Sequence, residues 1–335
     1  MIGYYAHHHG SGHLRHALTL AERLGDVTVL SSLARPDGVR VPWLELPMDA
    51  DPADPAPRDP TAGGALHWAP LGHRGLARRT AAVSAWLEQA RPDVVVCDVS
   101  QEVALLCRLH GVPVVSVVPP GHRDDAAHHL GLRAATRLCG FWPASADGVL
   151  TGLPDDVAAR VEPLGALSRL ATRSSGRRPG GGRRLVVLGG RGGDAWTTEQ
   201  VRRLEADATG WQVDVLGPGG TWVDDPAPLL AAADVVVVQA GQNAVAEAAA
   251  CRVPTIAVAA ARPFDEQVAT AAVLDRGPWP VVALPRLEHD DWPALLDRVA
   301  VLDGDAWATW CDGGAADRFA ALVRETAGAL TGTAA

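Results

Sequence analysis

Short runs of β-branched residues alternate along this 335-residue chain with stretches in which apolar residues recur every three or four positions. Such runs are typical of buried parallel strands, and the spaced stretches are typical of helices that cover a sheet. The pattern predicts a strand over residues 1–6, a helix up to residue 24 and a strand over 27–32, and the alternation continues afterwards. We therefore expect an α/β fold.

The alternation is interrupted by a segment of different composition. The run SRLATRSSGRRPGGGRR, which ends at residue 184, lacks apolar periodicity and is rich in Gly, Ser and Arg, as interdomain linkers are. We predict an N-terminal domain over 1–163, a linker over 164–184 and a C-terminal domain over 185–335, with a last helix that can pack back on the first domain. Each domain opens with a strand, a glycine turn and a helix, so we expect two Rossmann-like domains facing across a ligand cleft.

Composition and charge exclude several classes of protein. The apolar runs are short and broken by turns, and a strand begins at Met1 without a signal peptide, so we expect a cytoplasmic protein with no integral membrane segment. A net charge of −9 argues against a nucleic-acid partner. The five scattered cysteines contain no C-x-x-C pair and predict neither a disulfide frame nor a zinc site. All 30 basic residues are arginine, which excludes a lysine-based mechanism.

The turn Gly10-Ser11-Gly12-His13 stands where the first strand meets the first helix. It is not a dinucleotide fingerprint, because Arg15 occupies the place of the third glycine and the second strand ends in serines instead of a ribose-binding acid. We expect His13 to point from the helix start into the cleft, where an ordinary pKa of about 6.5 suits a general base for a hydroxyl proton. The alternative is a histidine that only packs the turn.

Other polar residues follow the same strand and the next one. Residues 7–9 are three consecutive histidines, which cannot all face one ion from extended backbone, so we expect one or two of them to line the cleft and predict no metal site. Asp98 follows a strand and can orient His13 or bind an acceptor hydroxyl. For Ser100 and Glu102 we favour simple helix capping over a role in the site.

The segment 234–267 carries the strongest indication of a ligand. A continuous β-branched strand at 235–238 is followed by a turn at Gly241, a helix, another strand and a polar turn. A helix N-terminus at the carboxyl end of a parallel strand offers N–H groups to an anion. Asn243, which we expect to cap this helix, shares a face with Glu247, so the carboxylate should lie where ribose hydroxyls of a nucleotide would be.

Two further segments of the second domain add to this site. The turn GGRGG at 189–193 can bind an anion, and Arg191 can hold a pyrophosphate with two hydrogen bonds, unless it is a solvent-facing arginine in a flexible loop. Arg262, Asp265 and Gln267 follow a strand and precede a helix. Asp265 is also a candidate N-cap, whereas Gln267 has no evident structural role.

Together these motifs resemble the GT-B glycosyltransferases, in particular the inverting nucleotide-sugar enzymes related to glycosyltransferase family 28 and the peptidoglycan UDP-N-acetylglucosamine transferases. The chain is similar to them at GSGH (10–13), GALSR (165–169), GGRGG (189–193), AGQNAVAE (240–247) and DEQ (265–267). The resemblance implies a GT-B fold, a donor site in the second domain and an acceptor site in the first.

Transferred to this chain, the family roles imply His13 and Asp98 as catalytic residues and Gly10, Ser11 and Gly12 as acceptor-binding residues. The implied reaction is metal-independent and inverting, and moves a sugar from a nucleoside-diphosphate sugar, by analogy a UDP-sugar, to a hydroxyl of a small-molecule or glycan acceptor. It needs no cofactor besides the donor. The implied donor-binding residues are Arg169, Gly190, Arg191, Gly241, Gln242, Asn243, Glu247, Asp265 and Gln267.

Two other functions fit the same motifs. A nucleotide-sugar hydrolase would release UDP and free sugar at a rate that no acceptor changes. A non-catalytic sugar-nucleotide binder would keep its biological activity after His13→Ala. Peripheral contact with a membrane is compatible with the sequence, which indicates no particular oligomeric state.

Overall fold

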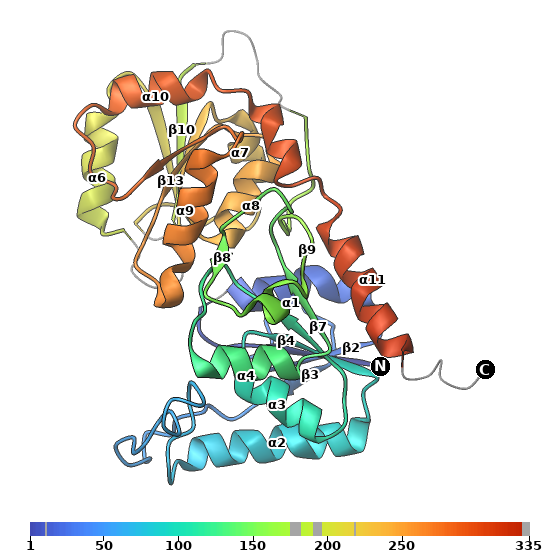
Figure 1. Cartoon of the computed structure of the whole chain (residues 1–335). Helices are drawn as coiled ribbons and strands as arrows, with labels where there is room; N and C mark the ends of the chain where they lie inside the picture. Colours follow the sequence, from blue (N-terminus) through green and yellow to red (C-terminus); the bar gives the residue numbers. More distant parts are fainter. Residues whose placement is uncertain (11, 175–181, 190–195, 218, 330–335) are drawn as a thin grey trace.

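The computed structural model describes residues 1–10, 12–174, 182–189, 196–217 and 219–329. These residues form two α/β units, one above the other in Figure 1, and each is built on a parallel sheet. The prediction of an α/β fold with two Rossmann-like domains is confirmed by this topology.

The N-terminal unit is a sheet of seven strands in the order β3-β2-β1-β4-β5-β7-β9, with every pairing parallel. A pair of two-residue strands, β6 and β8, lies outside it. The strands are β1 Ile2–Ala6, β2 Val27–Ser31, β3 Trp43–Glu45, β4 Val94–Asp98, β5 Val114–Val117, β6 Gly121–His122, β7 Arg137–Gly140, β8 Leu150–Thr151 and β9 Val161–Pro163. The helices are α1 Gly12–Leu24, α2 Arg74–Ala90, α3 Gln101–Leu109, α4 Ala126–Ala134 and α5 Asp155–Ala158.

The C-terminal unit is a five-stranded sheet in the order β11-β10-β12-β13-β14. Its strands are β10 Arg184–Leu188, β11 Gln212–Leu216, β12 Val235–Gln239, β13 Thr255–Val258 and β14 Val281–Leu284. The α-helices are α6 Thr198–Asp207, α7 Ala227–Ala232, α8 Gln242–Ala250, α9 Glu266–Arg276, α10 Trp292–Ala300 and α11 Ala315–Gly328, and the 3-10 helices are η1 Pro263–Asp265 and η2 Gly304–Thr309. The central strand β12 is buried along its whole length, as its β-branched run requires.

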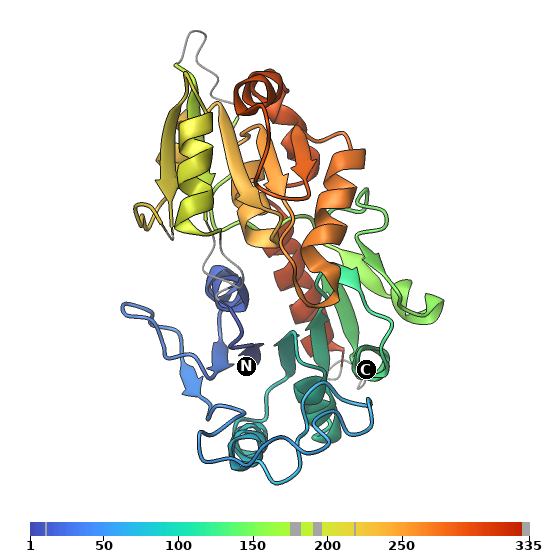
Figure 2. The same cartoon turned by 90° about the vertical axis from the view of Figure 1, so that its left-hand side faces the viewer.

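The last helix leaves the C-terminal unit and lies along the N-terminal one (Figure 2). It contacts α1, β4 and β5. Phe319 and Val323 of α11 are fully buried in one cluster with Leu20 of α1 and with Tyr4 and Val96 of the sheet. The opposite face of the same sheet packs on α2 and α3, so α11 completes the cover of the N-terminal sheet.

Short strands and turns depart most from the sequence pattern. β3, β7 and β9 extend the N-terminal sheet at its two ends, although none has a long apolar run. They form by pairing with β2, β5 and β7 respectively. Among the described residues, none of the helices is long and apolar enough to span a membrane. All five cysteines are buried free thiols.

Candidate active site

A histidine and a carboxylate meet where β1 and β4 end. The two strands are adjacent, with Ala6 opposite Asp98, and His13 lies in the first turn of α1. His13 Nδ1 is 2.9 Å from Asp98 Oδ1. Asp98 is completely buried, whereas the His13 side chain is 24% exposed. The structure thus brings together the two residues predicted to be catalytic.

The second carboxylate oxygen of Asp98 is also occupied. The Tyr4 hydroxyl donates a hydrogen bond to Oδ2 at 3.1 Å, and His16 Nδ1 lies 3.2 Å from the same atom. Burial alone would raise the pKa of Asp98, but His13 and His16 hold it well below its usual range. Asp98 is therefore an anion fixed by three partners.

The same contact determines the state of His13. Burial favours neutral His13, yet the adjacent Asp98 carboxylate outweighs it and raises the pKa of His13. Since a carboxylate only accepts hydrogen bonds, Nδ1 must carry the proton in this contact. In the neutral ring the lone pair is then on Nε2, and that nitrogen is the one able to accept a proton.

Ser100 and Glu102 have structural partners. Ser100 is the N-cap of α3 and accepts a hydrogen bond from Val103 N at 3.2 Å, which confirms the capping alternative for Ser100. Glu102 accepts the backbone N–H groups of His67 and Trp68 at 2.7 and 3.2 Å. It therefore anchors the segment that precedes α2.

The three consecutive histidines are packed together beside His13. The rings of His7 and His8 are stacked with centres 4.7 Å apart, and the His7 ring centre lies 6.3 Å from that of His13. Burial, aided by the neighbouring His8, lowers the pKa of His7 to about 3, so its ring is neutral at pH 7. His8 Nε2 is 3.5 Å from Asp49, a contact that the sequence did not indicate.

Three groups in the described part of the chain are spaced closely enough to hold a metal ion. In two of them the carboxylate oxygens already contact the ring nitrogens at hydrogen-bond distance, which explains the grouping without an ion. The groups are His7, His8 and Asp49; His13, His16 and Asp98; and His67, Asp125 and His128.

The turn after β12 places the start of α8 against the N-terminal unit. Gly241, which has no side chain, is the N-cap of α8, and the helix has no side-chain cap, so the expectation that Asn243 caps this helix is wrong. Asn243 instead faces α1, because a Cβ added to Gly12 would lie 3.2 Å from Asn243 Nδ2. A predicted acceptor residue and a predicted donor residue are therefore neighbours.

Glu247 contacts two arginines, one of which, Arg169, is a predicted donor-binding residue. Its buried carboxylate accepts a hydrogen bond from Arg169 Nε at 2.8 Å, and Arg15 Nη1 lies 3.8 Å from the same oxygen. Arg169 also donates to the Asp224 carbonyl oxygen at 2.8 Å. Sequence reasoning used Arg15 only to exclude a dinucleotide fingerprint and missed its place beside Glu247.

Two cavities are lined by the arginines that lie beside this carboxylate, Arg15 and Arg169. A small one is lined by Arg169, Asn243 and Glu247 together with α1. A larger one, of about 840 Å³, is lined by α1, by residues 166–172 and by Trp222 of the C-terminal unit. Trp222 had no signal in the sequence beyond its position in the loop after β11.

The polar turn before α9 lies next to the start of α8. Gln267 is buried, and its Oε1 accepts a hydrogen bond from Ala260 N at 3.0 Å. A Cβ added to Gly241 would be 3.6 Å from Gln267 Nε2. Asp265 stands at the N-cap position of α9 but makes no side-chain cap, so the capping alternative for Asp265 is wrong. Its side chain is exposed.

Two of the remaining predicted site residues lie at the starts of helices α1 and α8. Gly10 ends the turn before α1 with a φ of 76°, and Gln242 begins α8. Ser11, Gly190 and Arg191 lie outside the described residues.

No protein-family model matches the chain. It is 28% identical, over 94% of its length and 95% of the other protein, to the UDP-N-acetylglucosamine–N-acetylmuramyl-(pentapeptide) pyrophosphoryl-undecaprenol N-acetylglucosamine transferase of a Nocardioides species. Among solved structures it is similar to MurG of Acinetobacter baumannii, with 17% identity, a TM-score of 0.64 and coverage of 97% of this chain and 99% of that one. It is equally similar to CalG4, the calicheamicin glycosyltransferase, with 18% identity, a TM-score of 0.64 and 98% of both chains covered.

A match over nearly the whole chain, combined with two parallel sheets arranged as in these structures, identifies the chain as a glycosyltransferase of the GT-B fold. The resemblance inferred from the sequence motifs is confirmed. Within this class the chain is related to glycosyltransferase family 28 and its peptidoglycan UDP-N-acetylglucosamine transferases.

Proposed function

We propose that the chain transfers a sugar from a UDP-sugar to an acceptor hydroxyl, with inversion at the anomeric carbon and without a metal ion. The observation that carries the proposal is the 2.9 Å contact between His13 Nδ1 and Oδ1 of the buried Asp98. Because this contact holds the proton on Nδ1, Nε2 is left to take the proton of the acceptor hydroxyl. His13 is the base in this proposal, and Asp98 orients it.

In the proposed reaction the acceptor oxygen forms a bond to the anomeric carbon while its proton passes to His13 Nε2. The bond from that carbon to the diphosphate oxygen breaks on the opposite side, and its electron pair leaves with the diphosphate. A single displacement of this kind inverts the anomeric centre. Arg169 and the N-terminus of α8 would stabilise the leaving diphosphate, which supports a reaction without a metal.

Two side chains of α8 support a nucleotide-sugar donor. Glu247 lies about one turn beyond the N-terminus of the helix, at the place expected for an acid that binds ribose hydroxyls. Gln242 Nε2 is buried and has no hydrogen-bond partner among the residues that the structure describes, so an oxygen of the donor would satisfy it. UDP is proposed as the nucleotide because the curated relative is named for UDP-N-acetylglucosamine. The donor is the only co-substrate, and no cofactor is proposed.

The proposed acceptor is a hydroxyl of a small molecule or a glycan. The curated relative is named for an undecaprenol-linked acceptor, whereas CalG4 is a calicheamicin glycosyltransferase, so both kinds of acceptor occur among proteins similar to this chain. We propose a cytoplasmic location, with peripheral membrane contact if the acceptor is lipid-linked.

The test is an assay of UDP release from UDP-N-acetylglucosamine and UDP-glucose, with and without an acceptor panel and with EDTA present. We expect release that depends on the acceptor, persists in EDTA and gives a product whose anomeric configuration, read by NMR, is inverted. Release that ignores the acceptor and yields free sugar would assign hydrolysis instead. Donor binding with no turnover in any arm would leave a binding protein.

A further inference from the structure

The segment that joins β13 to α9 contains two successive non-glycine residues with a left-handed backbone. Phe264 has a φ of 60° and Asp265 a φ of 55°. Non-glycine residues rarely adopt this conformation and keep it only where the surroundings hold them. Gln267 holds this turn from within its own unit, through the hydrogen bond from Ala260 N to its Oε1.

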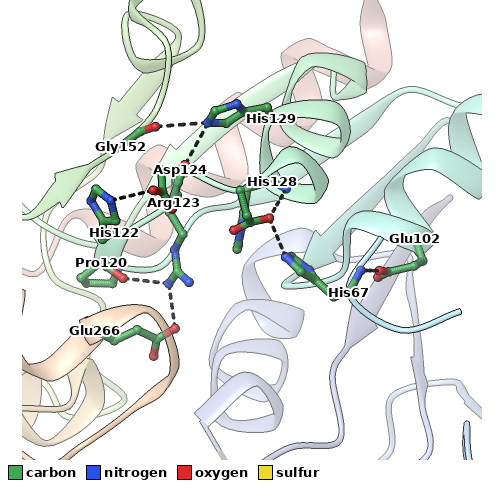
Figure 3. Close-up of polar contacts among 11 residues, drawn as sticks. His67, Glu102, Pro120, His122, Arg123, Asp124, His128, His129, Gly152 and Glu266 are labelled. Atoms are coloured by element: carbon green, nitrogen blue, oxygen red, sulfur yellow. Dashed lines mark hydrogen bonds and ion pairs between the residues drawn. The ribbon is translucent and has the colours of Figure 1, made fainter. Parts of the chain in front are cut away.

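The other side of the turn is held by Arg123 of the N-terminal unit (Figure 3). Arg123 Nη2 donates to Glu266 Oε1 at 2.7 Å, and the guanidinium carbon lies 4.5 Å from the centre of the Phe264 ring. An ion pair and a cation–π contact thus join one arginine to two residues of the turn. The backbones also approach closely, since a Cβ on Gly121 would lie 2.1 Å from the Phe264 carbonyl oxygen.

Arg123 is itself fixed in the N-terminal unit. It is 1% exposed, and Nη2 also donates to the Pro120 carbonyl oxygen at 2.8 Å. The Arg123 backbone N–H donates to the Thr151 carbonyl oxygen at 2.8 Å, and His129 Nε2 lies 3.1 Å from the Arg123 carbonyl oxygen. Figure 3 shows this arginine extended from the segment after β6 toward Glu266. A side chain so restrained can impose a geometry on the turn that it contacts.

Two histidines of the N-terminal unit complete the contact with Phe264. The ring centres of His128 and His67 lie 4.7 and 5.5 Å from that of Phe264. Asp125 holds both rings, with His67 Nε2 3.0 Å from Oδ1 and His128 Nδ1 against Oδ2. Burial outweighs Asp125 and lowers the pKa of His128 to about 4, so a neutral ring packs beside the arginine.

We propose that Arg123 is a positioning residue for the donor sugar. Through Glu266 and Phe264 it sets the backbone of the turn. Asp265 and Gln267, which the family resemblance assigns to donor binding, project from that backbone. The inference rests on the proposed function, because it needs a donor sugar for the turn to contact. In this proposal the geometry of the sugar site depends on residues of both units.

The test measures, by isothermal titration calorimetry, how much more tightly UDP-N-acetylglucosamine or UDP-glucose binds than UDP. In Arg123→Met we expect the UDP affinity to stay within about twofold of the wild type, because the nucleotide does not depend on this turn. The sugar gain, which is the ratio of the affinity for the UDP-sugar to the affinity for UDP, should fall by up to about tenfold. This is the size expected for the loss of one charge-assisted hydrogen bond. Glu266→Gln should reduce the same gain, and the double variant should lose little more than Arg123→Met alone.

Arg133→Met is the matched control, because Arg133 is an arginine of α4 whose ion pair with Asp156 is at the surface. It should change neither affinity. If Arg123→Met does not fold, as judged by circular dichroism, Glu266→Gln carries the test alone. An unchanged sugar gain in the folded variants overturns the inference, and so does a wild type that binds UDP but gains nothing from either sugar. A wild type that fails to bind UDP overturns the proposed function instead.

Discussion

Arg169 Nε lies 2.8 Å from Glu247 Oε1, so the segment between the two units is tied to the only carboxylate of α8. The Glu247 side chain is 4% exposed and that of Arg169 is 32% exposed. Arg15 brings a second guanidinium from the N-terminal unit to within 3.8 Å. One buried acid therefore contacts both units and the segment that connects them.

Glu247→Gln should weaken donor binding. The amide keeps the size of the side chain but removes the charge that orients Arg169 and the acceptor for ribose hydroxyls. We expect the Kd for UDP to rise by about tenfold or more, the loss of one charge-assisted hydrogen bond, and the rise in Tm caused by UDP to shrink. Glu199→Gln, in an exposed pair with Arg203, is the control and should change neither. A full UDP-induced Tm shift in E247Q would contradict the donor role.

His13→Ala should reduce kcat by about 100-fold or more, the usual contribution of a general base, and leave the Kd for UDP nearly unchanged. Steady-state kinetics and calorimetry on the same preparation separate the two quantities. His110→Ala provides the control, since His110 is an exposed histidine at the end of α3 that contacts Ser84. An H13A variant with wild-type turnover would remove His13 from the mechanism.

The rate of transfer should fall on acidification, because protonated His13 cannot accept a proton. Burial opposes the charged ring, but the Asp98 carboxylate raises the pKa of His13 above its ordinary value of about 6.5. Asp98→Asn removes the charge and leaves the burial, so the acid limb of kcat/KM should move to lower pH in the variant. A limb at the same pH in both proteins would show that another group titrates.

Acidification should also destabilise the fold through His7. Burial, aided by the neighbouring His8, lowers the pKa of His7 to about 3. The unfolded chain, with an ordinary histidine pKa of about 6.5, then binds more protons than the folded chain between these values. The free energy of unfolding should therefore decrease as the pH falls from about 6.5 to about 3. His7→Asn should flatten this dependence in urea titrations at pH 7, 5 and 4, whereas His110→Asn should not.

Phe319→Ala should destabilise the protein by about 3 to 5 kcal/mol, the usual cost of removing a buried phenyl ring. Phe319 is fully buried between α11 and the N-terminal sheet. Urea denaturation checks the value, with Val301→Ala, at a position that is 68% exposed, as the control. A change below about 1 kcal/mol would mean that α11 is readily detached.

The strands and helices with strong local patterns were predictable. β12 has a continuous β-branched run, and β14 was expected at 281–284, where it lies. β3 spans three residues and β7 has the sequence RLCG, so neither has a pattern of its own. Each is a strand because a neighbouring strand pairs with it, and such context outweighs local propensity.

The site was predictable where it depends on strand ends. Asp98 was expected near His13 because the carboxyl ends of parallel strands share one edge. His16 was missed, although its spacing of three from His13 places both on one helix face. The approach of Arg15 to Glu247 depends on how the two units are placed relative to each other, which no local sequence pattern encodes. The expectation that Asn243 caps α8 was wrong, since the N-cap position of this helix is occupied by Gly241.

The return of α11 to the first unit decides how this protein could be divided or recombined. A fragment ending at residue 163 would expose Tyr4, Leu20 and Val96 to water, since Phe319 and Val323 would no longer cover them. A self-sufficient N-terminal unit, the proposed acceptor half, would consist of two separate stretches of chain, with the C-terminal unit inserted between them. Chimaeras that exchange donor specificity should accordingly be joined at two crossover points, one after β9 and one before α11.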